Sequence, residues 1–311
     1  MRSVVKHSLG GRMTWISCSR LPRLMREYAD TYSRLPPHLQ TMLDALFPEP
    51  ADFLPEDGSV IIAAVPQRIV KVRFFYRGQK IDAVVPPTYD RRIDEQVISH
   101  IAPILEGAGY GIVPIELPKK YLAARAGLGK YGRNNILYLA GLGSFARLVS
   151  FHTDLPSTIR PLYAPRLHSS CELCERCVEA CPSGALRDGD IMDAYRCITF
   201  HNESTDPFPS WLDPSWMTCV VGCMRCQEVC PLNRTYLGHI RRMSFSEDET
   251  SIILGGDKNE ATPLLEEKLR DIGLFSEFFL LSRNLSFLIA NRTGQNPYGK
   301  FFIARQSRME R

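Results

Sequence analysis

Apolar and polar positions in the first half of the chain alternate between strand-like and helix-like patterns. Residues 59–65 form a short apolar run that ends at Pro66, which is typical of a strand buried on both faces. Residues 70–76 and 80–85 flank a short turn and predict a β-hairpin. Residues 93–108 place apolar side chains at helical spacing. This alternation predicts an α/β or α+β first domain.

The two ends of the chain have a different pattern. Residues 1–60 mix apolar and basic positions at helical spacing and break at prolines, so we expect short helices packed on a later sheet. Residues 244–260 are polar and contain glycine, which predicts a loop or linker. Two helices are expected at residues 263–272 and 275–290, and residues 292–311 are expected to fray.

Size and charge describe an ordinary soluble protein. A chain of 311 residues with 44% hydrophobic content is long enough for one to three domains. The formal charge of +4 is mildly basic, well short of the excess that by itself indicates nucleic-acid binding. We find no secretory signal and no apolar run long enough to span a membrane, so we expect a cytoplasmic protein without a membrane partner.

Ten cysteines, most of them in one short stretch, change this picture, because cytoplasmic thiols are kept reduced. The first run has the spacing Cys-x2-Cys-x2-Cys-x3-Cys-Pro, and a modified second run follows, as in proteins with two [4Fe–4S] clusters. Three thiolates of one such loop bind one cubane, while the cysteine before proline binds the other. We therefore assign Cys171, Cys174, Cys177 and Cys230 to cluster one, and Cys181, Cys197, Cys223 and Cys226 to cluster two.

Structural zinc and disulfides are the alternatives for these cysteines. A structural zinc site takes four ligands around one ion and can also be built from Cys-x2-Cys pairs. The x2-x2-x3-Pro spacing matches bacterial cluster proteins and not a zinc ribbon, which favours the clusters. We expect Cys18 and Cys219 to be packed free thiols. For Cys219 the alternative is a competing cluster ligand, since it lies four residues before Cys223.

Residues 127–132 contain a formal G-x-G-x-x-G string. A dinucleotide-binding fold needs a strand before this string and a helix after it. Here residues 117–125 predict a helix and residues 136–139 predict a strand, which is the reverse order. A glycine-rich turn still lets the backbone approach a large ligand closely, with plain turn geometry as the alternative. The candidate cofactor-binding residues are Gly127, Gly129, Gly132 and Asn134.

Four further polar residues flank these motifs. His152 and His201 are expected to be structural, with contact to a cofactor or a cluster as the alternative. Tyr89 and Asp90 follow two prolines, and we expect them in a surface loop, with the cofactor pocket as the alternative.

Several strings together resemble the epoxyqueuosine reductase family. They are LAARAGLGKYGRN at 122–134, FHTDLP at 151–156, the first cysteine run with PSGAL at 182–186, DAYRCI at 193–198, and CMRCQEVCPLN at 223–233. The resemblance spans about residues 58–235 and extends more weakly to Arg283, Asn284 and Leu285. It implies a cobalamin-binding domain, related to that of reductive dehalogenases, fused to two [4Fe–4S] clusters. In that family the clusters reduce the cobalamin, whose cobalt removes the epoxide oxygen from a modified tRNA base.

On this resemblance the chain divides into three parts. Residues 1–165 would form an α/β domain with a candidate corrinoid site. Residues 166–240 would form a ferredoxin-like domain with both clusters, and residues 241–311 a linker and a short helical C-terminal region.

The chain departs from the family at positions that matter for the substrate. The family's acidic proton donor falls on Val113, and Glu116 is the nearby carboxylate that we weigh as a substitute, against an exposed carboxylate at a helix start. An aromatic residue and a lysine of the family's glycine string are Lys130 and Arg133 here. Most of the family's C-terminal helical-repeat region, which resembles a tRNA-binding surface, has no match. These departures count against epoxyqueuosine as the substrate and tRNA as a partner.

We therefore expect an iron–sulfur oxidoreductase that passes low-potential electrons through two clusters to a cofactor, for which cobalamin is the candidate. The expected partners are an electron donor such as a ferredoxin or flavodoxin and a small-molecule or corrinoid substrate. The alternative is a non-catalytic electron-transfer module that docks on another corrinoid or redox protein, which the missing acid at Val113 favours. A third hypothesis is a tRNA-binding or regulatory iron–sulfur protein, and the modest net charge gives it little support.

Overall fold

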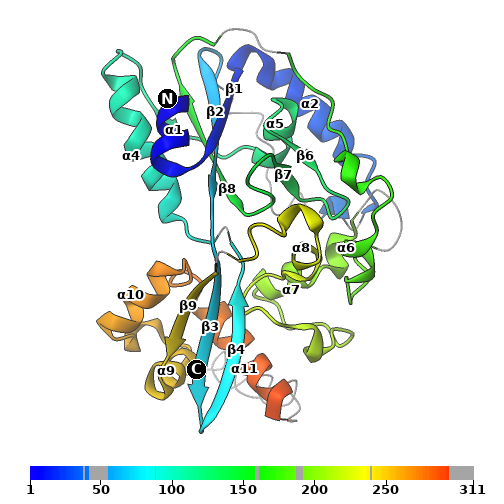
Figure 1. Cartoon of the computed structure of the whole chain (residues 1–311), viewed down its shortest axis with the longest axis vertical. Coiled ribbons are helices and arrows are strands. Elements are labelled where there is room, and N and C mark those ends of the chain that lie inside the picture. Colours follow the sequence, from blue (N-terminus) through cyan, green and yellow to red (C-terminus); the bar gives the residue numbers. More distant parts are fainter. Residues whose placement is uncertain are drawn as a thin grey trace.

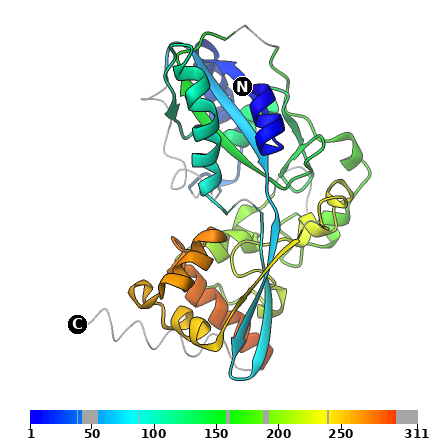
Figure 2. The same cartoon turned by 60° about the vertical axis from the view of Figure 1, so that its left-hand side comes forward.

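The computed structural model describes residues 1–37, 39–41, 55–87, 89–157, 161–186, 192–238 and 240–293. Two lobes lie one above the other, and the short helices of the cysteine-rich segment lie to one side between them (Figure 1). Figure 2 shows the same two lobes from another side, with the chain crossing between them where β2 passes into β3.

The upper lobe is built on a four-stranded sheet with helices on both faces. Each strand pairs antiparallel with its neighbours. The strands, in spatial order, are β1 (Arg12–Ser17), β2 (Ser59–Pro66), β8 (Ala146–Thr153) and β5 (Val113–Pro114). The helices are α1 (Arg2–Leu9), α2 (Leu21–Tyr32), α4 (Arg92–Glu106) and α5 (Lys119–Arg125).

Strand β2 supplies opposite faces to two hydrophobic cores. Ile61, Ala63 and Val65 pack with side chains of α1 and α4. Val60, Ile62 and Ala64 pack with side chains of α2 and α5. Because side chains alternate across a strand, this arrangement buries both faces, and the prediction from the apolar run is confirmed.

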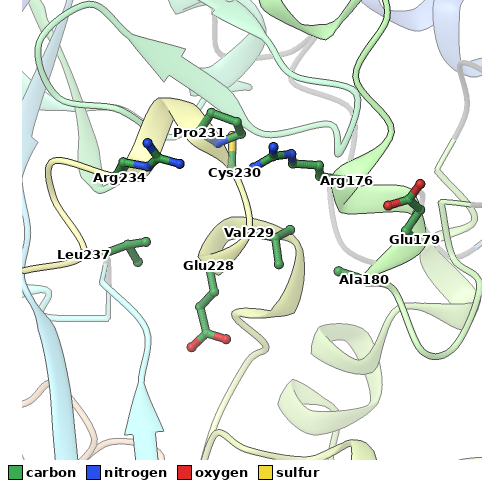
Figure 3. A pocket seen from close by; sticks show the side chains of 9 residues that line it. All are labelled: Arg176, Glu179, Ala180, Glu228, Val229, Cys230, Pro231, Arg234 and Leu237. Atoms are coloured by element: carbon green, nitrogen blue, oxygen red, sulfur yellow. The ribbon is translucent and has the colours of Figure 1, made fainter.

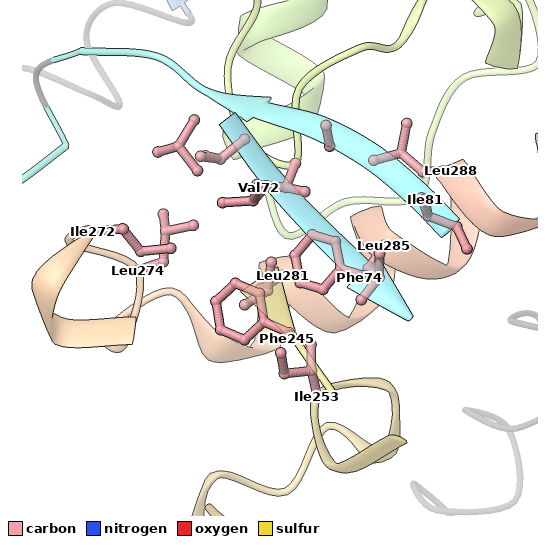
Figure 4. Packing of buried hydrophobic residues seen from close by; sticks show 14 of the residues in the cluster. Val72, Phe74, Ile81, Phe245, Ile253, Ile272, Leu274, Leu281, Leu285 and Leu288 are labelled. Atoms are coloured by element: carbon pink, nitrogen blue, oxygen red, sulfur yellow. The ribbon is translucent and has the colours of Figure 1, made fainter. Parts of the chain in front are cut away.

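The lower lobe joins the predicted hairpin to a later part of the chain. The strand order is β4 (Gln79–Val85), β3 (Ile69–Tyr76) and β9 (Ile240–Phe245), with β9 parallel to β3. Phe74 of β3 stacks on Phe245 of β9 with ring centroids 4.8 Å apart. Figure 4 shows these two rings within a cluster to which the C-terminal helices add leucines and isoleucines. These helices are α9 (Glu247–Gly255), α10 (Pro263–Asp271) and α11 (Phe278–Thr293).

A small hairpin packs against the core of the upper lobe, and short helices complete the chain. The hairpin consists of β6 (Gly129–Tyr131) and β7 (Leu137–Leu139), directly after α5, so the glycine string leads into a strand and not a helix, as expected. The short α-helices are α6 (Arg176–Glu179), α7 (Ile198–Glu203) and α8 (Arg225–Glu228). The 3-10 helices are η1 (Cys18–Arg20), η3 (Ser169–Cys171), η4 (Ala194–Arg196), η5 (Pro214–Trp216), η6 (Pro231–Asn233) and η7 (Lys258–Glu260).

Two local predictions are wrong. The loop expected at residues 244–260 contains the end of β9 and the whole of α9. Ser246 accepts a hydrogen bond from the Glu249 backbone N–H while the Glu249 carboxylate accepts one from the Ser246 N–H, a capping box that starts α9. The helices expected near the N-terminus are present, but strand β1 was missed. Most of the tail expected to fray, residues 294–311, lies outside the described residues.

The mixed helix and strand content agrees with the expected fold class. Within the described residues, no helix combines the length and the apolar character needed to cross a membrane.

Candidate iron–sulfur and cofactor site

The first group of cysteines combines one loop with a residue from the second run. Burial raises the pKa of Cys177, and the neighbouring thiolates of Cys171, Cys230 and Cys174 act in the same direction. Burial raises the pKa of Cys171 as well, again with Cys230 and Cys174 among its charged neighbours. Cys230 therefore lies with the three cysteines of the first loop, although it follows them by more than fifty residues in sequence.

The second group mirrors the first. Burial raises the pKa of Cys223 to about 12, with Cys197 and Cys181 as its neighbouring thiolates. The pKa of Cys226 is also raised by burial, and the neighbouring Cys223 and Cys197 act in the same direction. Thiols this reluctant to ionise hold their protons in the apoprotein, so binding of a metal centre must release them.

The two groups have the composition that the spacing predicts for two cubanes. The assignment of individual ligands remains a prediction. Among the described residues, no three His, Cys, Asp or Glu side chains converge closely enough to hold one metal ion. The two remaining cysteines are buried in apolar surroundings, Cys18 beside α2 and Cys219 beside Phe145 and Met224, as expected for packed thiols.

Arg133 fastens the first cysteine loop to the hairpin β6–β7. Its guanidinium donates to the backbone carbonyls of Cys171 at 2.9 Å, Glu172 at 3.2 Å and Cys174 at 3.2 Å. The planar guanidinium has enough donors in a fixed fork to hold three carbonyls at once. The residue that directly follows the glycine string thus holds the loop that carries three cysteines.

Asn134, the next residue, contacts the second group of cysteines directly and the first group through Tyr138. It is buried, and its amide donates to the Tyr138 hydroxyl at 3.0 Å. The Asn134 side chain also hydrogen-bonds Cys226, and Tyr138 hydrogen-bonds Cys230. Polar contacts of this kind orient metal ligands and tune the metal centre.

A cavity of about 410 Å³ lies against the second group of cysteines. Leu137 and Leu139 of β7 and Leu148 of β8 contribute its apolar walls. The cysteines that border it are Cys181, Cys197, Cys223 and Cys226. A cavity of this size with mostly apolar walls and a few polar groups is typical of a site for a small molecule or part of a larger cofactor.

Two of the polar groups in this cavity are paired with each other. The Tyr89 hydroxyl donates to the Glu203 carboxylate, and both side chains line the cavity. Burial raises the pKa of Glu203, the hydrogen bond from Tyr89 acts in the opposite direction, and the charge of Glu277 adds to the rise. Burial also raises the pKa of Tyr89 well above its ordinary value, with the Glu203 carboxylate as the second cause. The prediction that Tyr89 lies in a surface loop is therefore wrong.

Glu203 was missed by the sequence analysis. Its position on α7, six residues after Cys197, was the available signal, because a helix that begins at a cluster cysteine keeps its other end close by. Lys120 of α5 also lines the cavity; its side chain is accessible there, yet the surrounding protein desolvates the amine and lowers its pKa.

The predicted cofactor-binding residues do not all reach this cavity. Asn134 lines it, whereas Gly127, Gly129 and Gly132 are not among its lining residues. Val113 lies in β5, where 59% of its surface is exposed, and it pairs with His152 of β8. Glu116 is exposed and forms an ion pair with Lys119 at 3.0 Å. The position of the family's acid and its nearest carboxylate thus both lie outside the cavity lining.

Both histidines have backbone partners, as expected for structural residues. A ring nitrogen of His152 lies 2.9 Å from the Asp57 carbonyl, and one of His201 lies 2.6 Å from the Tyr195 carbonyl. Burial lowers the pKa of His201. A neutral His201 ring is consistent with its packing between Tyr195, Phe200 and Trp211.

One domain family and several curated proteins match part of this chain. A 4Fe-4S double cluster binding domain matches residues 170–233. An epoxyqueuosine reductase from Francisella cf. novicida is 34% identical over 113 residues, which are 36% of this chain and 31% of that protein. One from Synechocystis sp. is 33% identical over 123 residues, which are 39% of this chain and 41% of that protein. The match thus spans less than half the length of these curated relatives.

Solved structures extend the likeness to most of the chain. An epoxyqueuosine reductase from Streptococcus thermophilus has the same fold with a TM-score of 0.60 at 19% identity, over 93% of this chain and 80% of that chain. An epoxyqueuosine reductase with an epoxyqueuosine-modified tRNA stem loop matches with a TM-score of 0.58 at 17% identity, over 88% of this chain and 82% of that chain. The chain is thus similar in part of its sequence and in its fold to epoxyqueuosine reductases. Its double-cluster domain carries two [4Fe–4S] clusters, as the cysteine spacing predicted.

The chain also has a surface hollow of about 540 Å³ beside Cys230. In Figure 3, Arg176 of α6 and Arg234 extend toward Cys230 from opposite sides. Glu179 and Glu228 line the same hollow. Two cationic and two anionic side chains thus lie in one hollow next to a cysteine of the first group.

Proposed function

We propose that this chain is an iron–sulfur oxidoreductase that hands low-potential electrons to a group held in the cavity. One observation carries the proposal: the four cysteines of the second group border the cavity directly. Electron transfer falls off steeply with distance, so an acceptor in this cavity is well placed.

We assign the ligands as the spacing predicts. Cys171, Cys174, Cys177 and Cys230 would hold cluster one, and Cys181, Cys197, Cys223 and Cys226 would hold cluster two. The charged neighbours of Cys177 and Cys223 support this division. The hollow beside Cys230 supports entry of electrons at cluster one, from a ferredoxin or flavodoxin, and the cavity supports their exit at cluster two.

Cobalamin is the cofactor that we propose for the cavity. The apolar walls from β7 and β8 suit the faces of a corrin ring, and Asn134 and Lys120 offer polar partners for its amide-bearing rim. With cobalamin bound, the corrin would supply a cobalt centre that can accept the single electrons of the two clusters. Asn134 and Arg133 would keep the cysteine loops in position beside it.

A tRNA partner belongs to this proposal despite the departures at Val113 and in the C-terminal region. The matching fold that carries an epoxyqueuosine-modified tRNA stem loop makes such a stem loop the first substrate to test. The modest net charge of +4 predicts that any such binding will be weak in high salt unless base contacts add to it.

Anaerobic analysis of iron, sulfide and cobalt in freshly purified protein tests the core of the proposal. We expect about eight irons and eight sulfides per chain. Added cob(II)alamin should then change its visible and EPR spectra at stoichiometric protein. Zinc in place of iron would overturn the function altogether, and unchanged cobalt spectra would overturn the choice of cofactor.

The second candidate is an electron-transfer module that docks on another corrinoid or redox protein. The observation in its favour is that the family's acid position, Val113, carries no carboxylate and lies outside the cavity lining. A stable complex with a redox partner, together with no response of cobalamin to the protein alone, would select this candidate.

A further inference from the structure

We propose that Tyr89 and Glu203 form the proton-donating pair of the cavity and take the part of the acid that is absent at Val113. The proposal rests on the function proposed above, because it needs a group reduced in the cavity. It adds residues, a proton path and a class of substrate to that function.

The residues that line the cavity support this pair as the proton donor. Glu203 is the only carboxylate among the described residues that line it, and Tyr89 is the only phenol. The Tyr89 hydroxyl donates to Glu203 across 114 residues of sequence, so the contact comes from tertiary structure and not from a local turn. Both groups share the cavity with Cys197 and Cys223 of the second group, where electrons would arrive.

Two glycines allow Tyr89 to reach this position. A Cβ on Gly222 would lie 2.4 Å from the Tyr89 hydroxyl oxygen, and a Cβ on Gly273 would lie 2.3 Å from the Tyr89 carbonyl oxygen. Both glycines also have positive φ, at 66° and 74°, which other residues rarely adopt. The phenol and its backbone are therefore held from two sides by elements far apart in sequence, as expected for a positioned group.

The enclosed position of Glu203 keeps its proton available. The carboxyl is reachable from the cavity but enclosed by protein, and this burial is the main cause that raises its pKa. The hydrogen bond from Tyr89 acts against the rise, and the charge of Glu277 adds to it. The cationic groups at this cavity are Lys120 and Arg225, and the tyrosine hydroxyl faces the carboxyl directly. A carboxylic acid with a raised pKa, hydrogen-bonded to a phenol, is suited to general-acid chemistry near neutral pH.

The pair fits a reduction that consumes protons. A bound substrate S takes two electrons, supplied by the proposed function from a one-electron donor of the ferredoxin class, and two protons, giving SH₂. The Tyr89 phenol gives the first proton to the substrate. The carboxylic acid of Glu203 then turns its O–H to the phenol oxygen, the reverse of the resting hydrogen bond, and restores the proton. After Glu203 has taken a proton from water, the second proton follows by the same path. Each turnover thus consumes two electrons and two protons from solvent, and the pair returns to its starting state.

This chemistry selects a class of substrate. It favours a molecule in which a carbon–oxygen or other polar bond is reduced with uptake of protons. A simple one-electron acceptor would not need the pair. The carrier function therefore predicts no role for the Tyr89 and Glu203 protons.

Infrared difference spectroscopy of the full chain, reconstituted anaerobically with iron and sulfide, tests the pair without needing a known substrate. We expect a carboxylic-acid C=O band that persists above the ordinary glutamate range of about pH 4.3. It should be missing in Glu203→Gln and shifted in Tyr89→Phe, because the phenol donates to this group. Glu267→Gln, at an exposed position of α10, is the control that should leave the band unchanged.

Turnover provides a second measurement with an epoxyqueuosine-modified tRNA stem loop as the probe. If the parent protein reduces it, Glu203→Gln and Tyr89→Phe should each lower kcat about 100-fold with little change in KM. The pair is overturned if the protein has its full iron content but shows no Glu203-dependent band. It is also overturned if the band does not shift in Tyr89→Phe. Either result leaves the proposed function standing. Loss of iron from the parent protein itself instead overturns the proposed function.

Discussion

The Arg133 guanidinium donates to the Cys171 carbonyl at 2.9 Å, which ties the hairpin β6–β7 to the first cysteine loop. The same guanidinium holds the carbonyls of Glu172 and Cys174. Hydrogen bonds from a charged donor contribute about 1.5–3 kcal/mol each, so this contact has a large share in fixing the loop.

Arg133→Lys should therefore weaken cluster one and spare cluster two. A lysine keeps the charge but cannot hold three carbonyls in a planar fork. We expect about four of eight irons to be lost on mild chelation, as measured by iron analysis and EPR. Lys130→Ala, an exposed change in the same hairpin, should retain all of the iron. Equal loss from both variants would contradict the role given to Arg133.

Single cysteine variants should each remove one cluster. Cys177→Ser should lose cluster one and Cys226→Ser cluster two, with about four irons left per chain in each case. Because metal binding and folding are coupled in such segments, both variants should also melt at lower temperature. Cys18→Ala, which changes a buried thiol in another core, should keep its iron. Iron content equal to the parent's in either serine variant would refute the assignment of that ligand.

Charge reversal beside Cys230 should slow electron entry. Arg176→Glu with Arg234→Glu makes the hollow strongly acidic, since Glu179 and Glu228 already line it. Reduction by an acidic flavodoxin should slow about tenfold at low salt, and the difference should shrink as salt is added. Reduction by dithionite, which needs no docking surface, is the internal control and should keep its rate. A flavodoxin rate that does not change would place electron entry elsewhere.

The buried amide of Asn284 should be important for stability. Its nitrogen donates to the carbonyls of Asn202 at 2.9 Å and Val220 at 2.8 Å, joining α11 to the cysteine-rich segment. Asn284→Ala leaves these buried acceptors without their donor and should lower the free energy of unfolding by about 3 kcal/mol, measured in denaturant under anaerobic conditions. Asn291→Ala, on the same helix with one longer contact to Pro214, should cost about 1 kcal/mol or less. Similar losses in both variants would argue against a special role for Asn284.

Stability should depend on pH through Glu203. Its pKa is raised in the folded chain, chiefly by burial, so folding favours the protonated acid. The stabilising contribution is complete below the unfolded pKa of about 4.3 and is lost as the pH rises through the folded value. Glu203→Gln should therefore gain stability relative to the parent as the pH rises over this interval, measured by melting temperature at a series of pH values. Parallel melting curves across that interval would show that the carboxyl is not desolvated.

Local sequence was sufficient for the features that depend on near neighbours. The cysteine spacing predicted two clusters, because the thiolates of one tight loop must reach three corners of a cubane. The apolar run of β2 predicted a strand covered on both faces. The capping-box residues Ser246 and Glu249 were a local signal for the start of α9, although the polar composition there suggested a loop.

Contacts between distant segments were decided only by the tertiary structure. The hairpin β3–β4 was visible in the sequence, but its pairing with β9 was not, because the register of a parallel pair depends on the whole fold. Likewise the proton pair of Tyr89 and Glu203 joins the turn after β4 to the end of α7. Periodicity reports which face of an element is apolar, and it carries no information about which remote side chain will meet it.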